Sequence, residues 1–148
     1  AWQAEVGAQY DAKTIYNYIK NDDLSGLYNY EFYLNDQIYG SQYNDKLDGH
    51  NGNDYIDGWR GNDKLWGGPG YDDFYFAAYE GRDLIKDFSR KQDMIILDSS
   101  LAVDMYDVRA AAGKYKKGAV LDFGSDSQIK IEGITLKQLL NKVDFDFV

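Results

Sequence analysis

The sequence contains no cysteine, one proline and one histidine among its 148 residues. Disulfide bridges are therefore excluded, and a zinc site is disfavoured because zinc prefers cysteine and histidine ligands. No apolar run in the sequence approaches the roughly 18 residues that a membrane-spanning helix needs. Basic residues are also few, since 16 Lys and Arg stand against 25 Asp and Glu, for a formal net charge of −9. Such a chain repels nucleic acid and anionic membranes, and it favours cations as partners.

The chain starts at Ala1 without the basic region and the apolar core of a signal peptide. Because it also lacks an initiator methionine, we expect it to be part of a longer protein. An extracellular protein of this size usually depends on disulfides, so we expect bound metal to supply that stability here.

Aspartate recurs at every ninth residue in the middle of the chain, and an apolar residue follows each aspartate by two positions. Glycines keep the same period. The aspartates are Asp36, Asp45, Asp54, Asp63 and Asp72, the apolar residues are Ile38, Leu47, Ile56, Leu65 and Phe74, and the glycines are Gly40, Gly49, Gly58 and Gly67 with Gly52, Gly61 and Gly70. Three coupled patterns with one period indicate a repeat, and nine residues are too few for a helical one.

Each nonapeptide predicts a glycine-rich turn followed by a three-residue strand. Glycine permits turns with positive φ, and the middle residue of the strand points inward while its neighbours point outward. Two units then complete one coil, with strands on opposite walls, so that loops two units apart stack on one edge. The sequence therefore predicts an all-β fold: a right-handed parallel β-roll, followed by short C-terminal strands with one or two short helices.

This stacking pairs Asp36 with Asp54, Asp54 with Asp72, and Asp45 with Asp63. Two carboxylates brought together in a turn repel each other unless a cation lies between them. Carboxylate and carbonyl oxygens at flexible spacing suit calcium, whereas magnesium demands stricter octahedral geometry. An EF-hand is excluded because its alternating acidic ligands and closing glutamate are missing. A metal-free roll with solvated turns is the alternative, but it does not require aspartate at one fixed position.

The array resembles the RTX family, whose calcium-binding nonapeptide is G-G-x-G-x-D-x-U-x. The unit Gly67–Tyr75 matches every defined position, and units 49–57 and 58–66 lack only the second glycine. Unit 40–48 also has Tyr43 at position four, and the partial unit before it has Leu34 there. The resemblance implies binding of about three to four calcium ions. The implied metal-site residues are Asp36, Gly40, Gln42, Asp45, Gly49, Asn51, Gly52, Asp54, Gly58, Arg60, Gly61, Asp63, Gly67, Gly68, Gly70 and Asp72.

The resemblance continues past the array. Residues 81–88 and 93–97 are similar to the strands that follow the β-roll in secreted metalloproteases, lipases and polysaccharide-modifying enzymes of this family. By this similarity, Asp83 extends the edge of Asp63 and joins the metal-site residues. The ending Asp146-Phe147-Val148 resembles the acidic-then-apolar tail of type I secretion substrates. The resemblance thus implies a secreted, extracellular protein that meets the type I secretion apparatus.

Three segments follow from these patterns. Residues 1–34 are a Tyr-rich cap or linker, in which the apolar spacing favours a short helix over Asp11–Lys20. Asn21–Gly26 resembles a repeat, but it lies fourteen residues before Asp36 and is out of phase with the array. Residues 35–75 form the β-roll, and residues 76–148 form a β-rich flanking region with a secretion-signal-like tail.

In the flanking region, short apolar runs predict strands, and two polar patterns predict helices. Thr135 and Gln138 have capping-box spacing before Leu139, so a helix is expected to begin there. The predicted helix before it is Asp104–Ala112, and the predicted strands are Leu84–Phe88, Met94–Leu97, Val120–Phe123 and Ile129–Ile131.

Calcium-dependent folding outside the cell is the first functional hypothesis. Cytosolic calcium is too low to fill sites of the extracellular class, which bind at about 10⁻⁴–10⁻³ M. We expect the unfilled array to stay disordered during secretion and to fold cooperatively when calcium binds to it outside.

A calcium-dependent module that binds an acidic polysaccharide is the alternative. Outward-facing positions place Gln37, Asp57 and Asp73 with three tyrosines on one wall, and Lys46, Asp48 and Lys64 with a tryptophan on the other. These aromatic columns can stack on sugar rings, but the C-terminal strands can equally cover one wall and bury its aromatic residues. The candidate ligand-binding residues are Tyr39, Tyr55, Trp66 and Tyr75.

Catalysis within the chain is a third hypothesis, and the sequence argues against it. His50 is the only histidine and lies in a glycine-rich turn, and neither a Ser/His/Asp group nor a phosphate-binding loop is present. We expect no enzyme activity in these residues, although a catalytic domain can precede them in the parent protein.

Overall fold

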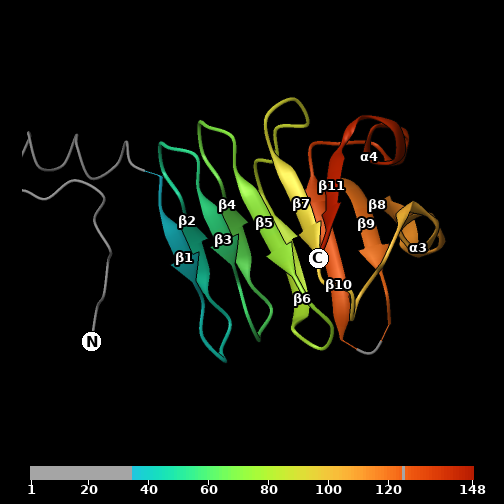
Figure 1. Ribbon diagram of the computed structural model, residues 1–148, viewed down its shortest axis with the longest axis horizontal. Coiled ribbons are helices and arrows are strands. Elements are labelled where there is room, and N and C mark those ends of the chain that lie inside the picture. Colours follow the sequence, from blue (N-terminus) through green and yellow to red (C-terminus); the bar gives the residue numbers. More distant parts are fainter. Residues whose placement is uncertain (1–34, 125) are drawn as a thin grey trace, which may run out of the picture.

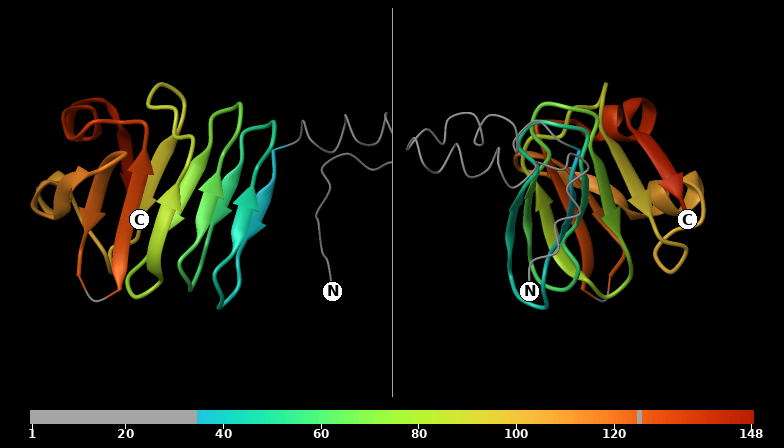
Figure 2. Two further views of the ribbon diagram at one scale, coloured as in Figure 1. Left: turned by 180° about the vertical axis from the view of Figure 1, so that it is seen from behind. Right: turned by 60° about the vertical axis from the view of Figure 1, so that its left-hand side comes forward.

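The computed structural model describes residues 35–124 and 126–148. Two sheets face each other, and the chain advances along the long axis from β1 at one end to the helices at the other (Figure 1 and Figure 2). The predicted helix Asp11–Lys20 and the repeat-like Asn21–Gly26 lie outside the described residues.

The strands of the repeat array alternate between the two sheets. They are β1 (Gln37–Tyr39), β2 (Lys46–Asp48), β3 (Tyr55–Asp57), β4 (Lys64–Trp66) and β5 (Asp73–Phe76). The later strands are β6 (Gly81–Ile85), β7 (Met94–Leu97), β8 (Ala112–Tyr115), β9 (Gly118–Asp122), β10 (Ser127–Glu132) and β11 (Asp144–Phe147).

The strand order confirms the predicted parallel β-roll. Sheet A has five strands in the order β1-β3-β5-β7-β11, and sheet B has six in the order β2-β4-β6-β10-β9-β8. Neighbours within the roll are parallel and in register, so that Ile38 pairs with Ile56, and Ile56 with Phe74. On the other wall Leu47 pairs with Leu65. The nine-residue period therefore sets both the alternation and the register.

The middle residue of each short strand lies in the core between the sheets. Ile56, Leu65 and Phe74 are fully buried, whereas Ile38 and Leu47 in the first coil are only partly buried. Burying one such side chain contributes about 1.5–3 kcal/mol. Each nonapeptide thus adds one apolar residue to the core, and the first coil gains least because no described coil lies on its outer side.

The C-terminal strands extend both sheets and cover neither wall. In sheet A, β7 pairs in parallel with β5, and β11 pairs in parallel with β7. In sheet B, β10 pairs in parallel with β6, and β9 and β8 follow it in antiparallel pairing. The alternative in which these strands cover one wall is therefore wrong. Each C-terminal strand forms backbone hydrogen bonds with the strand beside it in the sheet, so it lengthens the sheet and does not pack on its face.

The predicted strand Leu84–Phe88 is misplaced, because β6 begins at Gly81 and ends at Ile85. The carboxylate of Asp87 accepts hydrogen bonds from the backbone N–H groups of Gly67 and Gly68, at 3.0 Å each, which makes residues 86–88 part of a turn. The other three predicted strands lie within or overlap β7, β9 and β10. Sequence patterns missed β8 and β11.

Both helices predicted in the flanking region 76–148 are confirmed. α3 (Met105–Ala111) starts after Asp104, whose carboxylate accepts hydrogen bonds from two backbone N–H groups of the first turn. α4 (Leu136–Lys142) starts at a capping box made by Thr135 and Gln138. Within the part of the chain that the structure describes, no helix has the length and apolar character needed to cross a membrane.

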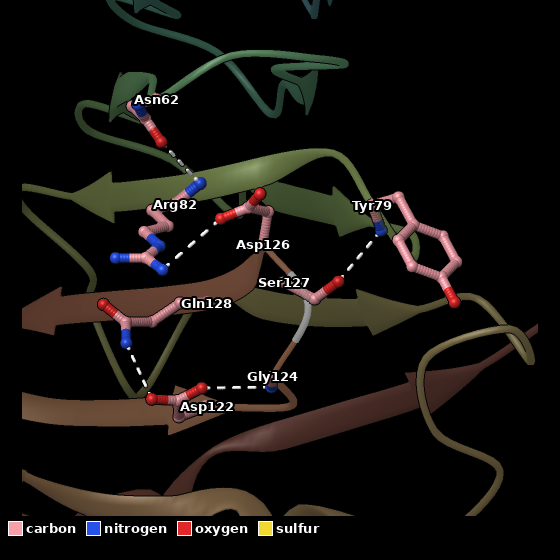
Figure 3. A network of polar contacts seen from close by, with 8 residues as sticks. All are labelled: Asn62, Tyr79, Arg82, Asp122, Gly124, Asp126, Ser127 and Gln128. Atoms are coloured by element: carbon pink, nitrogen blue, oxygen red, sulfur yellow. Dashed lines mark hydrogen bonds and ion pairs between the residues drawn. The ribbon is translucent and has the colours of Figure 1, made fainter.

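Polar contacts fix the turn between β9 and β10 beside β6 and the repeat unit 58–66 (Figure 3). The backbone N–H of Arg82 donates to Asn62 Oδ1 at 2.9 Å, and its guanidinium lies 3.3 Å from the carboxylate of Asp126. These contacts hold β10 against β6 where the repeat sequence has ended. The remaining contacts in this network are Tyr79 to Ser127, Gly124 to Asp122, and Gln128 to Asp122.

Candidate metal centre

Loops between the sheets stack on two edges of the roll. Loops 49–54, 67–72 and 86–93 lie on one edge, here named the Asp54 edge. Loops 40–45, 58–63 and 77–80 lie on the other, here named the Asp63 edge.

Backbone-to-carboxylate hydrogen bonds connect the aspartates along each edge. The N–H of Asp36 donates to Asp54 Oδ1 at 2.8 Å, and the N–H of Asp54 donates to Asp72 Oδ1 at 3.0 Å. On the Asp63 edge, the N–H of Asp45 donates to Asp63 Oδ1 at 2.8 Å. The structure therefore brings together all three pairs that the sequence predicted.

The same contact continues beyond the repeat array on both edges. The N–H of Asp63 donates to Asp83 Oδ1 at 2.9 Å, so Asp83 does extend the Asp63 edge. The N–H of Asp72 donates to Asp93 Oδ1 at 3.4 Å, and sequence reasoning missed Asp93 as a member of the site. Its signal was present, because Ile95 follows Asp93 at the two-residue step of the array.

Three buried carboxylate oxygens on these edges have no hydrogen-bond partner. They are the Oδ2 atoms of Asp54, Asp63 and Asp72, whose side chains are 2%, 1% and 0% exposed. A buried acceptor left without a partner costs about 1–3 kcal/mol, and more when it is charged. A cation bound beside these oxygens would offset the free-energy cost of burying them. No hydrogen-bond donor among the described residues offsets that cost.

Burial is the main reason why the pKa values of these carboxyl groups rise. It raises the pKa of Asp54 and of Asp63 to about 6, although one backbone N–H donated to each carboxylate opposes the effect. Burial also raises the pKa of Asp72, of Asp93 to about 7, and of Asp83 to about 8. Neighbouring carboxylates add to the rise, and at Asp54 the nearby His50 offsets a small part of it.

Glycine lets the carboxylates approach backbone carbonyls. A Cβ atom on Gly49 would lie 2.4 Å from Asp54 Oδ2 and 2.6 Å from the carbonyl oxygen of Gly67. One on Gly70 would lie only 1.5 Å from the carbonyl oxygen of Gly52. The space that a methyl group would fill is therefore bordered by oxygen atoms, as a site for a hard cation requires.

The donor set fits calcium. Among residues 35–124 and 126–148, no group of three or more His, Cys, Asp and Glu side chains is placed to hold a metal by itself. A cation in these turns must therefore combine carboxylates with backbone carbonyls, which is a mixture that calcium accepts at flexible geometry. When bound, calcium would neutralise the buried carboxylates held by Asp54, Asp63 and Asp72.

The other predicted metal-site residues lie in the same loops. Gln42 and Arg60 are exposed and Asn51 is half-buried, so their contribution to a buried cation would come from the backbone. Gly68 has φ of 89°, and His50 and Trp59, which occupy the same position in their units, have φ of 67° and 61°. This left-handed position explains why the repeat favours glycine there, although three of the four units carry Ser41, His50 or Trp59 instead.

The candidate ligand-binding aromatics lie on opposite walls. Tyr39, Tyr55 and Tyr75 form a row on the outer face of sheet A, with ring centroids 6.0 Å and 6.1 Å apart. Trp66 lies on sheet B and is half-buried. The structure therefore does not bring Trp66 together with the tyrosines.

Stacked glycine turns with buried, unpartnered carboxylates define a β-roll of the calcium-binding class. Residues 33–65 match the family model for the RTX calcium-binding nonapeptide repeat (4 copies). The chain therefore contains an RTX β-roll module, and this module binds calcium.

Among solved structures, the chain is similar to the AlgE6R3 subunit of the mannuronan C5-epimerase from Azotobacter vinelandii, determined in solution. The two share 18% sequence identity, the match covers 76% of each chain, and the TM-score is 0.39. No curated protein matches the chain.

Proposed function

We propose that this RTX module folds when three to four calcium ions bind outside the cell, and that it supports type I secretion and the stability of a larger extracellular protein. The observation that carries the proposal is the set of unpartnered Oδ2 atoms of Asp54, Asp63 and Asp72. The fold buries these oxygens, and among the described residues no hydrogen-bond donor reaches them.

The energies indicate that calcium decides whether the module folds. At ten times its dissociation constant, a ligand stabilises the folded state by about 1.4 kcal/mol per site. Three or four such sites together contribute about 4–6 kcal/mol, which is comparable with the whole stability of a small domain. In the cytosol the sites stay empty, because their expected dissociation constants are about 10⁻⁴–10⁻³ M. The chain would then stay unfolded for export and would fold on reaching millimolar calcium.

Circular dichroism tests this proposal directly. The spectrum should change from that of a disordered chain in chelator to a β-rich one in millimolar calcium, with a cooperative transition that chelator reverses. Magnesium at the same concentration is the control and should have little effect. A spectrum that is the same in chelator and in calcium would refute the proposal.

Binding of an acidic polysaccharide is the second candidate function, and the charges on sheet B favour it. Lys46 pairs with Lys64, Lys64 with Leu84, and Leu84 with Lys130, so three lysines lie in one row across neighbouring strands. The outer face of sheet A carries Asp57, Asp73, Asp144 and Asp146 in its strands and no Lys or Arg. Trp66, next to the lysine row, is therefore better placed for an acidic polymer than the three tyrosines.

Calorimetric titration with a soluble polyuronate in calcium tests this candidate. Binding should be weakened at least about tenfold in the double variant Lys46→Glu/Lys64→Glu, since two favourable charges become repulsive. Tyr55→Ala, on the other wall, is the matched control and should leave the affinity unchanged. Equal affinities of both variants and the parent chain would rule out the lysine row as the binding site.

We also propose that the module is not itself catalytic, because calcium occupies its buried carboxylates. Prolonged incubation with the polyuronate should leave the length and the composition of the polymer unchanged.

A further inference from the structure

The Asp54 edge contains a dipeptide that is chemically labile. Asn51 is followed by Gly52, and no other asparagine in the sequence precedes a glycine. Glycine has no side chain to hinder its backbone nitrogen, so this nitrogen can approach the side-chain amide carbon of the asparagine before it. Asparagine is among the thermolabile residues of proteins. Spontaneous deamidation of this chain is therefore easiest at Asn51.

The reaction consumes only water. The backbone nitrogen of Gly52 gives up its proton and bonds to Cγ of Asn51, the Cγ–Nδ2 bond breaks, and the amide leaves as ammonia. Water then opens the cyclic succinimide that remains. Addition at Cγ breaks the new bond to Gly52 and gives aspartate. Addition at the backbone carbonyl carbon breaks the original peptide bond and gives isoaspartate, in which the main chain runs through the side chain and is longer by a methylene group.

The folded roll holds the attacking nitrogen away from this reaction. The N–H of Gly52 donates to the carbonyl of Pro69 in the stacked loop at 3.2 Å. The N–H of the next residue, Asn53, donates to Asn35 Oδ1 at 2.8 Å. Moving the Gly52 nitrogen onto the side chain of Asn51 requires the stacked loops to separate. The reaction therefore proceeds through the open fraction of the molecules, which is small when the fold is stable.

The isoaspartate product does not fit the stack of loops. A Cβ atom on Gly70 would lie 1.5 Å from the carbonyl oxygen of Gly52, and one on Gly68 would lie 1.8 Å from that of His50. The carbonyls on both sides of Asn51 thus pack directly against the next loop, and an additional methylene group in this segment would displace them. A calcium ion on this edge also depends on backbone carbonyls of these loops.

We propose that Asn51–Gly52 is a deamidation site that is open in the unfolded chain and closed in the folded roll, so that a chain kept without calcium gradually loses its ability to fold. The inference rests on the calcium-dependent folding proposed above. Calcium then has two effects, since it stabilises the fold and also preserves the loop that helps to bind it. A chain that meets calcium early folds intact, whereas a chain held without calcium accumulates isoaspartate in the Asp54 edge.

The repeat supplies matched controls. The position of Asn51 carries Gln42, Arg60 and Pro69 in the other three units. Glutamine cyclises more slowly because its ring would be larger, and Gln42 shows that a repeat unit accepts it, so Asn51→Gln removes the site with little change to the loop. Internal references are also present, because Asn44, Asn53 and Asn62 each precede an aspartate, whose side chain hinders its backbone nitrogen.

Incubation of the full chain in chelator and in millimolar calcium, at one pH and temperature, tests the proposal. Peptide mass spectrometry measures the replacement of the Asn51 amide by an acid, and isoaspartate-specific methylation measures the isomer. We expect modification of Asn51 to be at least about tenfold slower in calcium, because it then proceeds through the small open fraction. Magnesium should give the rate seen in chelator. Asn44, Asn53 and Asn62 should remain largely intact in all three media.

Circular dichroism of the same samples separates this inference from the proposed function. If the calcium sample is folded and Asn51 reacts equally fast in both media, or stays intact in chelator, the inference fails and calcium-dependent folding stands. If the calcium sample is not folded, both fail.

The ability of incubated chains to fold is the second readout. When calcium is added to chains that were incubated in chelator, the folded fraction should be nearly free of isoaspartate at position 51. The Asn51→Gln variant, incubated in the same way, should lose its ability to fold more slowly than the parent chain. Equal isoaspartate in the folded and unfolded fractions, or equal rates of loss for the two chains, would overturn the proposal.

Discussion

Replacing Asp63 with asparagine should change the stability of the module in opposite directions with and without calcium. Asp63 is 1% exposed, its Oδ1 accepts the N–H of Asp45, and its Oδ2 has no partner. Asparagine keeps the shape and the accepting oxygen, so the contact with Asp45 can remain. What the variant loses is the negative charge.

The pKa of Asp63 gives the gain in stability that we expect for the variant without calcium. A pKa of about 6 in the fold, against 3.8 for the free carboxyl group, corresponds to about 3 kcal/mol against the ionised form at neutral pH. Water that reaches the turn screens part of this cost, and the new amide N–H also lacks a partner. We therefore expect Asp63→Asn to stabilise the metal-free fold by about 1 kcal/mol.

With calcium, we expect the variant to lose stability, because a charged calcium ligand is replaced by a neutral one. The calcium concentration at half-folding should rise at least about tenfold, which corresponds to about 1.4 kcal/mol. Circular dichroism during a calcium titration measures this change. In chelator, folding can be forced with trimethylamine oxide, and its midpoint should fall for the variant.

Asp73→Asn is the matched control, since it removes the same charge from the outer face of sheet A. Burial and the nearby Asp146 raise the pKa of Asp73, so its replacement should favour folding in both media. If Asp63→Asn also shifts stability in the same direction in both media, Asp63 does not hold calcium and the reasoning fails.

Three further predictions concern backbone approach, core packing and the left-handed turn position. Gly70→Ala should abolish calcium-induced folding, because its Cβ would lie 1.5 Å from the carbonyl oxygen of Gly52, whereas Gly124→Ala, which meets no atom within 4 Å, should fold. Leu65→Ala should cost about 2–5 kcal/mol in urea unfolding with calcium, and Leu47→Ala should cost less because Leu47 is only partly buried. Trp59→Gly should change stability by less than about 1 kcal/mol, because relief of the left-handed strain and the entropy of glycine nearly cancel, and calcium titration should show unchanged affinity.

The repeat array could be predicted from the sequence because three patterns with one period agree. The apolar position fixed which residue of each strand lies in the core, as the full burial of Ile56 and Phe74 shows. The aspartate position fixed the pairs on each edge, which the hydrogen bond from Asp54 to Asp72 confirms. A one-residue slip would have moved every apolar residue outward, so the register had no competing solution.

Beyond Phe76 the prediction became weaker because loop length varies while stacking persists. Asp93 continues the Asp54 edge at a spacing of 21 residues, which a search at a fixed period does not find. β11 was missed because its residues Asp144-Phe145-Asp146-Phe147 pair with the distant β7, and that partner sets its conformation. The turn at Asp87 depends on N–H groups of Gly67 and Gly68, which sequence patterns do not place.

The two oxygens of each edge aspartate have different tasks, and this explains why the repeat uses aspartate where asparagine would support stacking. Asp54 Oδ1 accepts the N–H of Asp36, and Asp72 Oδ1 accepts that of Asp54, which are contacts that an amide oxygen makes equally well. Asn44 and Asn53, one position earlier in their units, make such contacts with an amide. If stacking were the only requirement, either residue type would serve at both positions. The second oxygen of Asp54 and of Asp72 remains buried without a partner, and only a bound cation makes its charge favourable.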